Sequence, residues 1–189
     1  MKEQGAKERI LNTASELFYQ QGYQATGINQ IIEEAGIAKA SLYQHFPSKE
    51  ALLTEYLLRT RLCRLEERTA FLKDMAPGKE KLMGLYEYRL QHMKGNNFKG
   101  CAFIRVAYEL PGLNEDALLQ IRTHTEHLKS FITEQLQAIK NPFPADELTE
   151  MADMLLNLYE GAGQQGYMQK SPKPMENTQK VVLKLLSTL

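Results

Sequence analysis

The stretch GIAKASLYQHFPSKEALL, residues 36–53, decides how the beginning of this chain folds. A glycine opens it, and a run with helical spacing continues to a Phe-Pro pair, where the residue before proline disfavours the helical conformation. We therefore expect a short helix from Lys39 to His45. Leu42 and Phe46 are four residues apart and share one side of that helix, so they are its expected buried anchors. The outer face then carries Lys39, Ala40, Ser41, Tyr43, Gln44 and His45.

Another helix is predicted directly before this stretch, and Gly36 ends it. Ile28, Ile31 and Ile32 have the spacing of one helix face. Thr26 precedes them as a candidate N-cap. A helix, a turn that contains glycine and a second short helix form the helix-turn-helix pattern. The same pattern also suits a plain pair of packed helices with a solvated outer face.

The start of the next helix is a candidate phosphate site. Ser48 is its expected N-cap, and Lys49 lies in the first turn, where a helix N-terminus and a lysine together favour a phosphate group. The whole chain has no net charge, which argues against a protein that coats nucleic acid without sequence preference. Residues 36–49 hold two lysines, one histidine and no acid, so phosphate contacts are expected there.

Helical periodicity dominates the rest of the 189 residues, and no segment alternates apolar and polar residues as a strand does. The sequence predicts an all-α fold of about nine helices, with a three-helix head and a larger helical body. We predict a helix-turn-helix DNA-binding domain over residues 1–47 and a larger helical domain over residues 48–189. A helix over 48–73 links the two. The later helices are expected at 79–93, 101–109, 114–140, 148–162 and from 174 towards 189.

The sequence argues against several classes of protein. No apolar run approaches the roughly 18 residues of a membrane span, and the N-terminus lacks the apolar core of a signal peptide, so we expect a cytoplasmic protein. Cys63 and Cys101 make no disulfide framework. His124 and His127 are spaced as two metal ligands, but no third ligand is evident and no metal is expected. Without a nucleophile elbow, a phosphate loop or a carboxylate pair, we expect neither an enzyme nor a cofactor.

Two runs, ILNTASELFYQQGYQATGINQIIEEAG and KASLYQHFPSKEALL, carry a resemblance that covers residues 7–57. They resemble the N-terminal domain of the TetR/AcrR family of bacterial transcriptional repressors, and LYQHFPSKEAL is the most specific part. The resemblance implies a homodimer, joined through the last two helices, whose heads enter successive major grooves of a palindromic DNA operator. It also implies a small-molecule inducer that binds the body.

The resemblance further implies which residues contact DNA. Phosphate contacts fall on Thr26, Tyr43, His45 and Lys49, and base contacts fall on Lys39, Ala40 and Gln44. Ser41 shares their outer face and joins the DNA-binding candidates. Chemistry agrees in part, since glutamine can pair with adenine and lysine with guanine, whereas alanine can only touch a thymine methyl group. Ala38 departs from the family, which commonly has a capping serine there, and the missing cap costs roughly 1 kcal/mol of helix stability.

The segment FKGCAFIRVAYELPGLNEDA, residues 98–117, is the most informative part of the body. Its Gly-Cys pair before a short helix resembles one branch of the family. Cys101 has two interpretations: a reactive thiolate at a helix N-terminus that senses an oxidant or electrophile, or a small buried residue that only packs. For Arg105 and Glu109, mutual pairing is favoured over ligand contact. The ligand-binding candidates are Tyr86, Cys101, Arg105, Tyr108, His124 and Tyr159.

Three glycines fall close together in one predicted helix of the body. Gly161, Gly163 and Gly166 each cost about 1 kcal/mol there relative to alanine. They suit either a close approach by a neighbouring helix or ligand, or fraying near the helix end.

These observations predict a ligand-responsive, DNA-binding transcriptional regulator. Its simplest form is a repressor that a small molecule or a thiol-reactive inducer releases from a palindromic operator. The alternative is an all-α ligand-binding or interaction module without DNA-binding activity.

Overall fold

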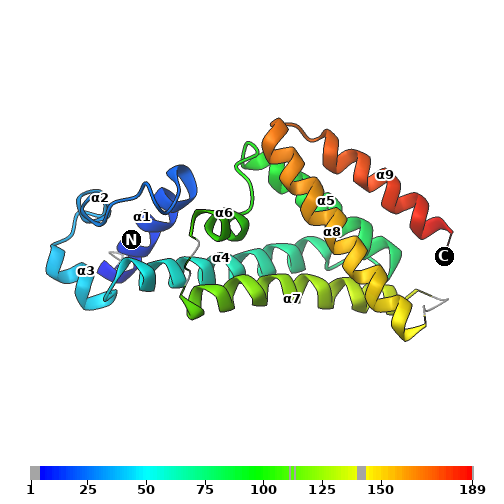
Figure 1. Ribbon diagram of the computed structural model, residues 1–189, viewed down its shortest axis with the longest axis horizontal. Helices are drawn as coiled ribbons and strands as arrows, with labels where there is room; N and C mark the ends of the chain where they lie inside the picture. Colours follow the sequence, from blue (N-terminus) through cyan, green and yellow to red (C-terminus); the bar gives the residue numbers. More distant parts are fainter. Residues whose placement is uncertain (1–4, 111, 113, 140–143, 189) are drawn as a thin grey trace. The chain divides into compact units, whose positions relative to one another are not determined.

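The computed structural model describes residues 5–110, 112, 114–139 and 144–188. Within these residues the chain forms nine α-helices and no β-strand, so the predicted all-α fold is confirmed (Figure 1). The helices are α1 (Ala6–Gln21), α2 (Ile28–Glu34), α3 (Lys39–His45), α4 (Lys49–Leu72), α5 (Lys79–Gly95), α6 (Ala102–Glu109), α7 (Glu115–Gln137), α8 (Ala145–Gln169) and α9 (Lys173–Ser187).

The chain forms two compact units, and each unit consists of two separate segments of the sequence. Unit 1 comprises residues 5–63 and 102–122, and unit 2 comprises residues 64–101 and 123–188. Helices α4 and α7 therefore contribute residues to both units. The two units reflect which residues pack together. The predicted boundary after residue 47 instead separates functions, DNA binding from ligand binding, and it stays a prediction.

Unit 1 begins with three helices that pack on one another, α1 against α2 and α3. The predicted apolar face of α1 is buried, and Ile10 and Ala14 are fully covered. Ile31 from α2 and Leu42 from α3 are buried as well, and Phe46 follows α3 into the same interior. Because α3 is only seven residues long, its conformation depends on this burial rather than on its own helix propensity.

The prediction that Thr26 caps α2 is wrong. The N-cap residue is Gly27, and no side chain caps this end of the helix. Thr26 is buried, and its hydroxyl donates a 2.7 Å hydrogen bond to the carbonyl oxygen of Gly22 instead. A buried hydroxyl needs a partner inside the protein, and the carbonyl beside the end of α1 provides it.

Side chains cap two other helices, and the prediction for Ser48 is confirmed. The backbone N–H of Ala51 donates to Ser48 Oγ at 3.1 Å, at the start of α4. The backbone N–H of Ala117 donates to Asn114 Oδ1 at 2.8 Å, at the start of α7. In both cases the side chain satisfies one of the N–H groups that a helix start leaves unpaired.

Within unit 1, α6 is fastened to the turn that follows α1 by the carboxylate of Glu109. This carboxylate accepts hydrogen bonds from the backbone N–H groups of Tyr23 at 2.8 Å and Gln24 at 3.2 Å. The expected ion pair with Arg105 is present at 3.8 Å. Arg105 also donates a 2.7 Å hydrogen bond to the carbonyl oxygen of Tyr19, so α6 contacts the end of α1 through two charged side chains.

Gly22 makes this attachment possible. Its φ of +97° lies in the left-handed region, which a residue with a Cβ avoids. A Cβ at this position would also lie 2.7 Å from Glu109 Oε1, closer than real Cβ atoms approach an oxygen. The turn after α1 therefore needs glycine both for its backbone angle and for the approach of the carboxylate.

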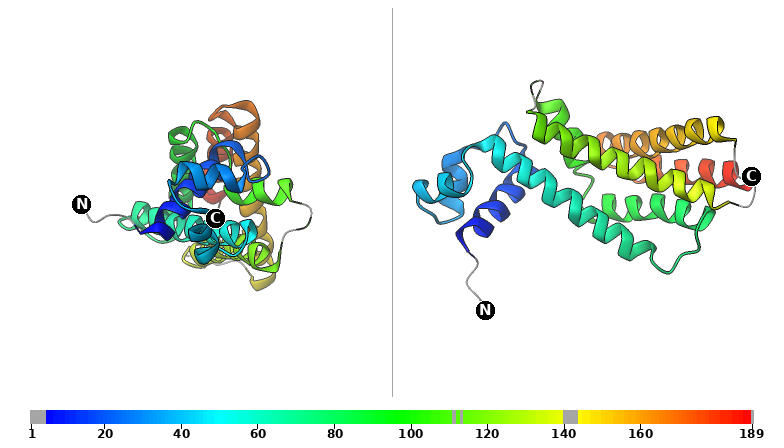
Figure 2. Two further views of the ribbon diagram at one scale, coloured as in Figure 1. Left: turned by 90° about the vertical axis from the view of Figure 1, so that its left-hand side faces the viewer. Right: turned by 90° about the horizontal axis from the view of Figure 1, so that it is seen from below.

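Unit 2 contains α5, α8 and α9 side by side, as the views in Figures 1 and 2 agree. Their facing sides bury Leu82 and Leu85 of α5, Leu155 of α8, and Val182 and Leu186 of α9. Ala152, Tyr159 and Ala162 of α8 belong to the same core. The helix itself is longer than predicted and continues to Gln169.

Two of the three glycines in α8 lie in close contact with α5. A Cβ at Gly163 would lie 2.7 Å from a guanidinium nitrogen of Arg89, and one at Gly166 would overlap the end of Met93. Gly161 faces open space. The contacts at Gly163 and Gly166 agree with a close approach by a neighbouring helix. The fraying interpretation is wrong, because α8 continues past all three glycines to Gln169.

Two further properties concern the described part of the chain. None of its helices combines the length and apolarity of a membrane span. Among the same residues, no three metal-binding side chains of histidine, cysteine, aspartate or glutamate gather at one place.

Replacing Glu109 with alanine is expected to lower the free energy of unfolding by about 1–3 kcal/mol. The substitution leaves the N–H groups of Tyr23 and Gln24 without their acceptor and Arg105 without its carboxylate. Equilibrium urea unfolding followed by circular dichroism measures the change. The control is Glu16→Ala, which removes an exposed carboxylate from α1. Equal losses for the two variants would contradict the role of Glu109.

Candidate nucleic-acid interface and ligand cavity

Helix α3 presents the predicted set of side chains to solvent. Lys39, Ala40, Gln44 and His45 are exposed, and Tyr43 is 43% exposed although it is aromatic. Ser41 on the same helix is half-buried. Since Leu42 and Phe46 are buried beneath them, the orientation of the whole face follows from the two anchors. The face offers hydrogen-bond donors, an aromatic ring and no carboxylate.

The start of α3 lacks a side-chain cap, as the sequence indicates. Ala38 occupies the N-cap position with an extended backbone and makes no side-chain hydrogen bond. The first turn is closed by the backbone alone, through the N–H groups of Ser41 and Leu42 bonded to the Ala38 carbonyl oxygen.

Lys49 lies at the start of α4, but its ammonium group is engaged within unit 1. It donates a 2.6 Å hydrogen bond to the carbonyl oxygen of Tyr23 and lies 4.1 Å from the centre of the Tyr23 ring. Partial burial lowers the pKa of Lys49 against the opposing effect of Glu50 and Glu109. Burial and the neighbouring Glu50 raise the pKa of Tyr23 to about 12. The phosphate contact of Lys49 therefore stays a prediction. To make it, the ammonium group would have to bind phosphate in addition to Tyr23 or in its place.

The other predicted phosphate contact outside α3 is Thr26, which is 1% exposed. Its hydroxyl points into unit 1 towards Gly22, and Gln21 Nε2 donates to it at 3.3 Å. The exposed residues of α3 and the buried hydroxyl of Thr26 therefore do not form one surface in this conformation. The role of Thr26 also stays a prediction.

The residues predicted to bind a ligand lie in different surroundings. Tyr86 and Tyr159 meet in the core of unit 2, with ring centres 5.6 Å apart and nearly perpendicular planes. The Tyr86 hydroxyl donates a 2.7 Å hydrogen bond to the Leu155 carbonyl oxygen. Burial is the largest cause that raises the pKa of both tyrosines, so both stay neutral and serve the core in this conformation.

The remaining four candidates divide between the two units. Arg105 holds α6 in unit 1, and Tyr108 on the same helix is 82% exposed. Cys101 and His124 belong to unit 2, where Cys101 is half-buried and its thiol interacts with Arg89. Burial, reinforced by Arg89 and Arg68, lowers the pKa of His124 to about 3, so its imidazole is neutral near pH 7.

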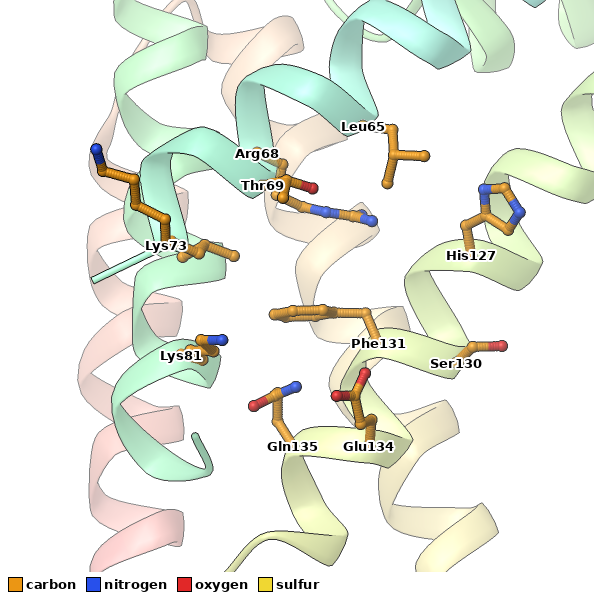
Figure 3. Close-up of a pocket in the computed structure, with 11 residues that line it drawn as sticks. Leu65, Arg68, Thr69, Lys73, Lys81, His127, Ser130, Phe131, Glu134 and Gln135 are labelled. Carbon is orange, nitrogen blue, oxygen red and sulfur yellow. The ribbon is translucent and has the colours of Figure 1, made fainter. Parts of the chain in front are cut away.

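Unit 2 contains a cavity of about 420 Å³ that none of these six residues lines (Figure 3). It lies among the end of α4, the start of α5 and the middle of α7. Its walls combine apolar side chains with several cations and one carboxylate. The lining residues are Leu65, Arg68, Thr69, Leu72, Lys73, Lys81, His127, Ser130, Phe131, Glu134 and Gln135.

Sequence reasoning predicted none of these lining residues. Arg68 is the least expected of them, because an arginine on a long helix is usually exposed. It is only 7% exposed, and its guanidinium lies 5.2 Å from the centre of the Phe131 ring. A signal exists in the sequence: Arg61, Arg64 and Arg68 are spaced at three and four residues and share one face of α4. That pattern places Arg68 near other arginines but does not reveal its burial.

Comparison with known proteins agrees with the helix-turn-helix head. Residues 10–56 match the family described as bacterial regulatory proteins, tetR family. An uncharacterised HTH-type transcriptional regulator of Bacillus subtilis, YxaF, is 54% identical over 56 residues. This alignment spans 29% of the present chain and only 29% of the length of YxaF.

Two longer similarities extend into the body. An uncharacterised HTH-type transcriptional regulator from the lacX 3′ region of Lactococcus lactis subsp. lactis is 31% identical over 144 residues, 70% of this chain and 69% of that protein. The HTH-type transcriptional repressor NemR of Escherichia coli K12 is 24% identical over 98% of this chain and 96% of NemR. The crystal structure of reduced E. coli NemR aligns with a TM-score of 0.78 at 22% identity, covering 94% of this chain and 95% of NemR.

The head and the body both resemble known transcriptional regulators. The head has the helix-turn-helix arrangement and matches the family over α1, α2, α3 and the start of α4. The similarity to the Lactococcus regulator covers more than two thirds of both chains. The chain therefore belongs to the TetR family of bacterial transcriptional regulators.

Proposed function

We propose that this regulator is a repressor whose homodimer binds a palindromic operator and leaves it when an inducer binds the body. Regulators of this family bind DNA and are not enzymes. The observation that carries the proposal is the outer face of α3, where donors and an aromatic ring are exposed without a nearby carboxylate. The name of NemR, a transcriptional repressor similar over nearly its full length, supports repression over activation.

In this proposal, α3 enters the major groove and its residues divide into two roles. Gln44 pairs with adenine, Lys39 with guanine, and Ala40 touches a thymine methyl group. The DNA backbone is held by Tyr43 and His45, with Ser41 beside them and with contributions from Thr26 and Lys49. Contacts to phosphate fix the position of the head, and contacts to base edges select the sequence.

A homodimer through α8 and α9 is supported by apolar side chains that unit 2 leaves in solvent. Met154 on α8, and Val181 and Leu183 on α9, are 39%, 56% and 53% exposed. Helices α8 and α9 pack against each other within the unit, so their outer sides can present one continuous surface. Large exposed apolar patches are uncommon on monomers and typically mark contact with another protein. A dimer also supplies the two heads that a palindromic operator requires.

The body, residues 48–189 in the predicted division, is proposed to receive a small molecule or a thiol-reactive inducer. The half-buried thiol of Cys101 beside Arg89 supports the second possibility. The inducer would favour a conformation in which the two heads no longer fit successive major grooves. Helix α4 is the proposed connection, because it is continuous from Lys49 to Leu72. As a regulator of DNA without a membrane-spanning helix in its described residues, the protein is proposed to act in the cytoplasm.

Alanine at Gln44 or Lys39 is expected to weaken operator binding by about 1–3 kcal/mol, because each change removes contacts to a base edge. The operator is first selected from random duplexes with the wild-type protein. Fluorescence anisotropy at several salt concentrations then measures affinity for the operator and for a scrambled duplex. Each variant should lose operator affinity and keep its weak affinity for the scrambled duplex.

The matched controls for this experiment are Gln137→Ala and Lys79→Ala, which remove exposed side chains of the same types from α7 and α5. Both should bind the operator as the wild type does. Failure of the wild-type protein to distinguish any selected duplex from the scrambled one would contradict the proposal. The alternative, a ligand-binding or interaction module without DNA-binding activity, would then be favoured.

Lysine at Leu183 is expected to convert the dimer into monomers, because it places a charge in an apolar contact. Sedimentation velocity of the purified protein measures the oligomeric state. Leu119→Lys is the control, since Leu119 is exposed to a similar extent, 56%, but lies on α7. A wild-type monomer, or a Leu183→Lys variant that remains dimeric, would count against this interface.

A further inference from the structure

The cavity in unit 2 contains a buried arginine that lacks a counter-anion. Three arginines lie near one another in this unit. Arg64 binds the carboxylate of Glu67 at 2.8 Å, and Arg89 lies 3.6 Å from the carboxylate of Glu160. Arg68 is more fully buried than a typical arginine, yet among the described residues it pairs with no carboxylate. Its guanidinium lies over the ring of Phe131. The hydroxyl groups of Tyr159 and Tyr88 also interact with its charge.

The Phe131 contact does not offset the cost of burying this charge. A cation over an aromatic ring is stabilised by less than the cost of removing an unpaired ion from water. Burial lowers the pKa of Arg68 and outweighs the opposing effects of Tyr159 and Tyr88. Burial also raises the pKa of both tyrosines, so their hydroxyl groups are neutral near pH 7 and supply no full negative charge. The arrangement is therefore unfavourable for the ligand-free protein.

The guanidinium of Arg68 extends into the cavity rather than into packed protein. Figure 3 shows it above the ring of Phe131, on the side where Leu65 and His127 lie. In the same view the ammonium group of Lys73 points away from these groups, whereas that of Lys81 points towards the cavity. Among the cations that line the cavity, Arg68 is the buried one. A volume of about 420 Å³ lies within the range of protein sites that bind small organic molecules.

The surroundings of Arg68 add positive potential. Burial, followed by Arg89, Arg68 and Arg64, lowers the pKa of the neighbouring His124 to about 3. Gln135 already accepts a 3.2 Å hydrogen bond from the backbone N–H of Gly78. Glu134 is the single acid of the lining, and Figure 3 places it on the far side of the Phe131 ring from the guanidinium.

We propose that this cavity binds a small organic acid, whose carboxylate pairs with Arg68 and whose apolar part lies against Phe131, Leu65 and Leu72. The planar guanidinium presents parallel N–H donors that fit the two oxygens of a carboxylate. The aromatic ring and the two leucines supply the apolar wall that such a molecule needs. This inference rests on the proposed function in one respect, which is that the organic acid is the inducer.

The test compares acids with their uncharged amides on the full-length protein without DNA. Benzoate, phenylacetate and octanoate are each paired with the corresponding amide, and inorganic phosphate serves as an anion without an apolar part. Isothermal titration calorimetry measures affinity, and thermal unfolding shows stabilisation by ligand. At least one acid should bind about tenfold or more tightly than its amide, because a hydrogen bond to a charged group is lost in the amide.

Two variants of Arg68 separate a role in binding from a role in folding. Arg68→Met keeps the length of the side chain and removes its charge, so it should abolish the preference for acids. Without ligand it should unfold at the same or a higher urea concentration, because the uncompensated buried charge is gone. Arg68→Lys keeps the charge and should retain part of the preference. Lys180→Met, at an exposed position on α9, is the control and should bind as the wild type does.

Three results would overturn the inference. The first is equal or absent binding of every acid and its amide. The second is an undiminished preference for acids in Arg68→Met, which would place the anion elsewhere. The third is an Arg68→Met variant that unfolds at a much lower urea concentration, which would assign the arginine to the fold. Tighter binding of phosphate than of any organic acid would also contradict the apolar half of the site.

The same proteins separate this inference from the proposed function. An acid that binds through Arg68 but leaves operator binding unchanged supports the site and contradicts its role as the inducer site. An acid that releases the wild-type protein from the operator, but not Arg68→Met, supports both. If the wild-type protein binds no operator, the proposed repression fails while the calorimetric result still decides whether the cavity accepts acids.

Discussion

The burial of Leu42 and Phe46 is the constraint on which the proposed DNA-binding face of α3 depends. Helix α3 has seven residues and no side-chain cap, so it would not be stable as an isolated helix. Its two anchors lie in the interior formed with α1 and α2, and this fixes the rotation of the helix about its own axis. Every statement about which side chains reach DNA therefore follows from two apolar contacts, and the polar residues themselves contribute little to the shape.

The helices could be predicted from the sequence because their signals are local. Glycine, proline and capping side chains mark most of the ends, and the apolar spacing marks the buried faces. Thr26 shows where local reasoning fails. Its position before α2 suits an N-cap, but its burial makes the Gly22 carbonyl oxygen the nearer partner. Whether the hydroxyl accepts from an N–H group of α2 or donates to the Gly22 carbonyl oxygen depends on tertiary packing, which the sequence pattern does not contain.

The same distinction separates the two candidate sites. The face of α3 lies on one helix, so helical periodicity was enough to identify its members. The predicted ligand-binding residues are spread over several helices of the body. Two of them, Tyr86 and Tyr159, pack in the core of unit 2 and do not line the cavity. The cavity is assembled from three helices that are distant in sequence, and Arg68 matters because of what it lacks. An absent partner leaves no pattern in a sequence, so only the packed structure reveals it.

The glycines of α8 limit how this protein can be engineered. Helix propensity alone recommends alanine at every glycine inside a helix, and such exchanges are a common route to thermostable variants. At Gly163 and Gly166, however, the missing side chains admit Arg89 and Met93, so an added methyl group would separate α8 from α5. Gly161 alone of the three has free space around its Cα. A consensus or design procedure that treats the three positions alike would therefore strengthen one turn of the helix and loosen the interior that α5 and α8 share.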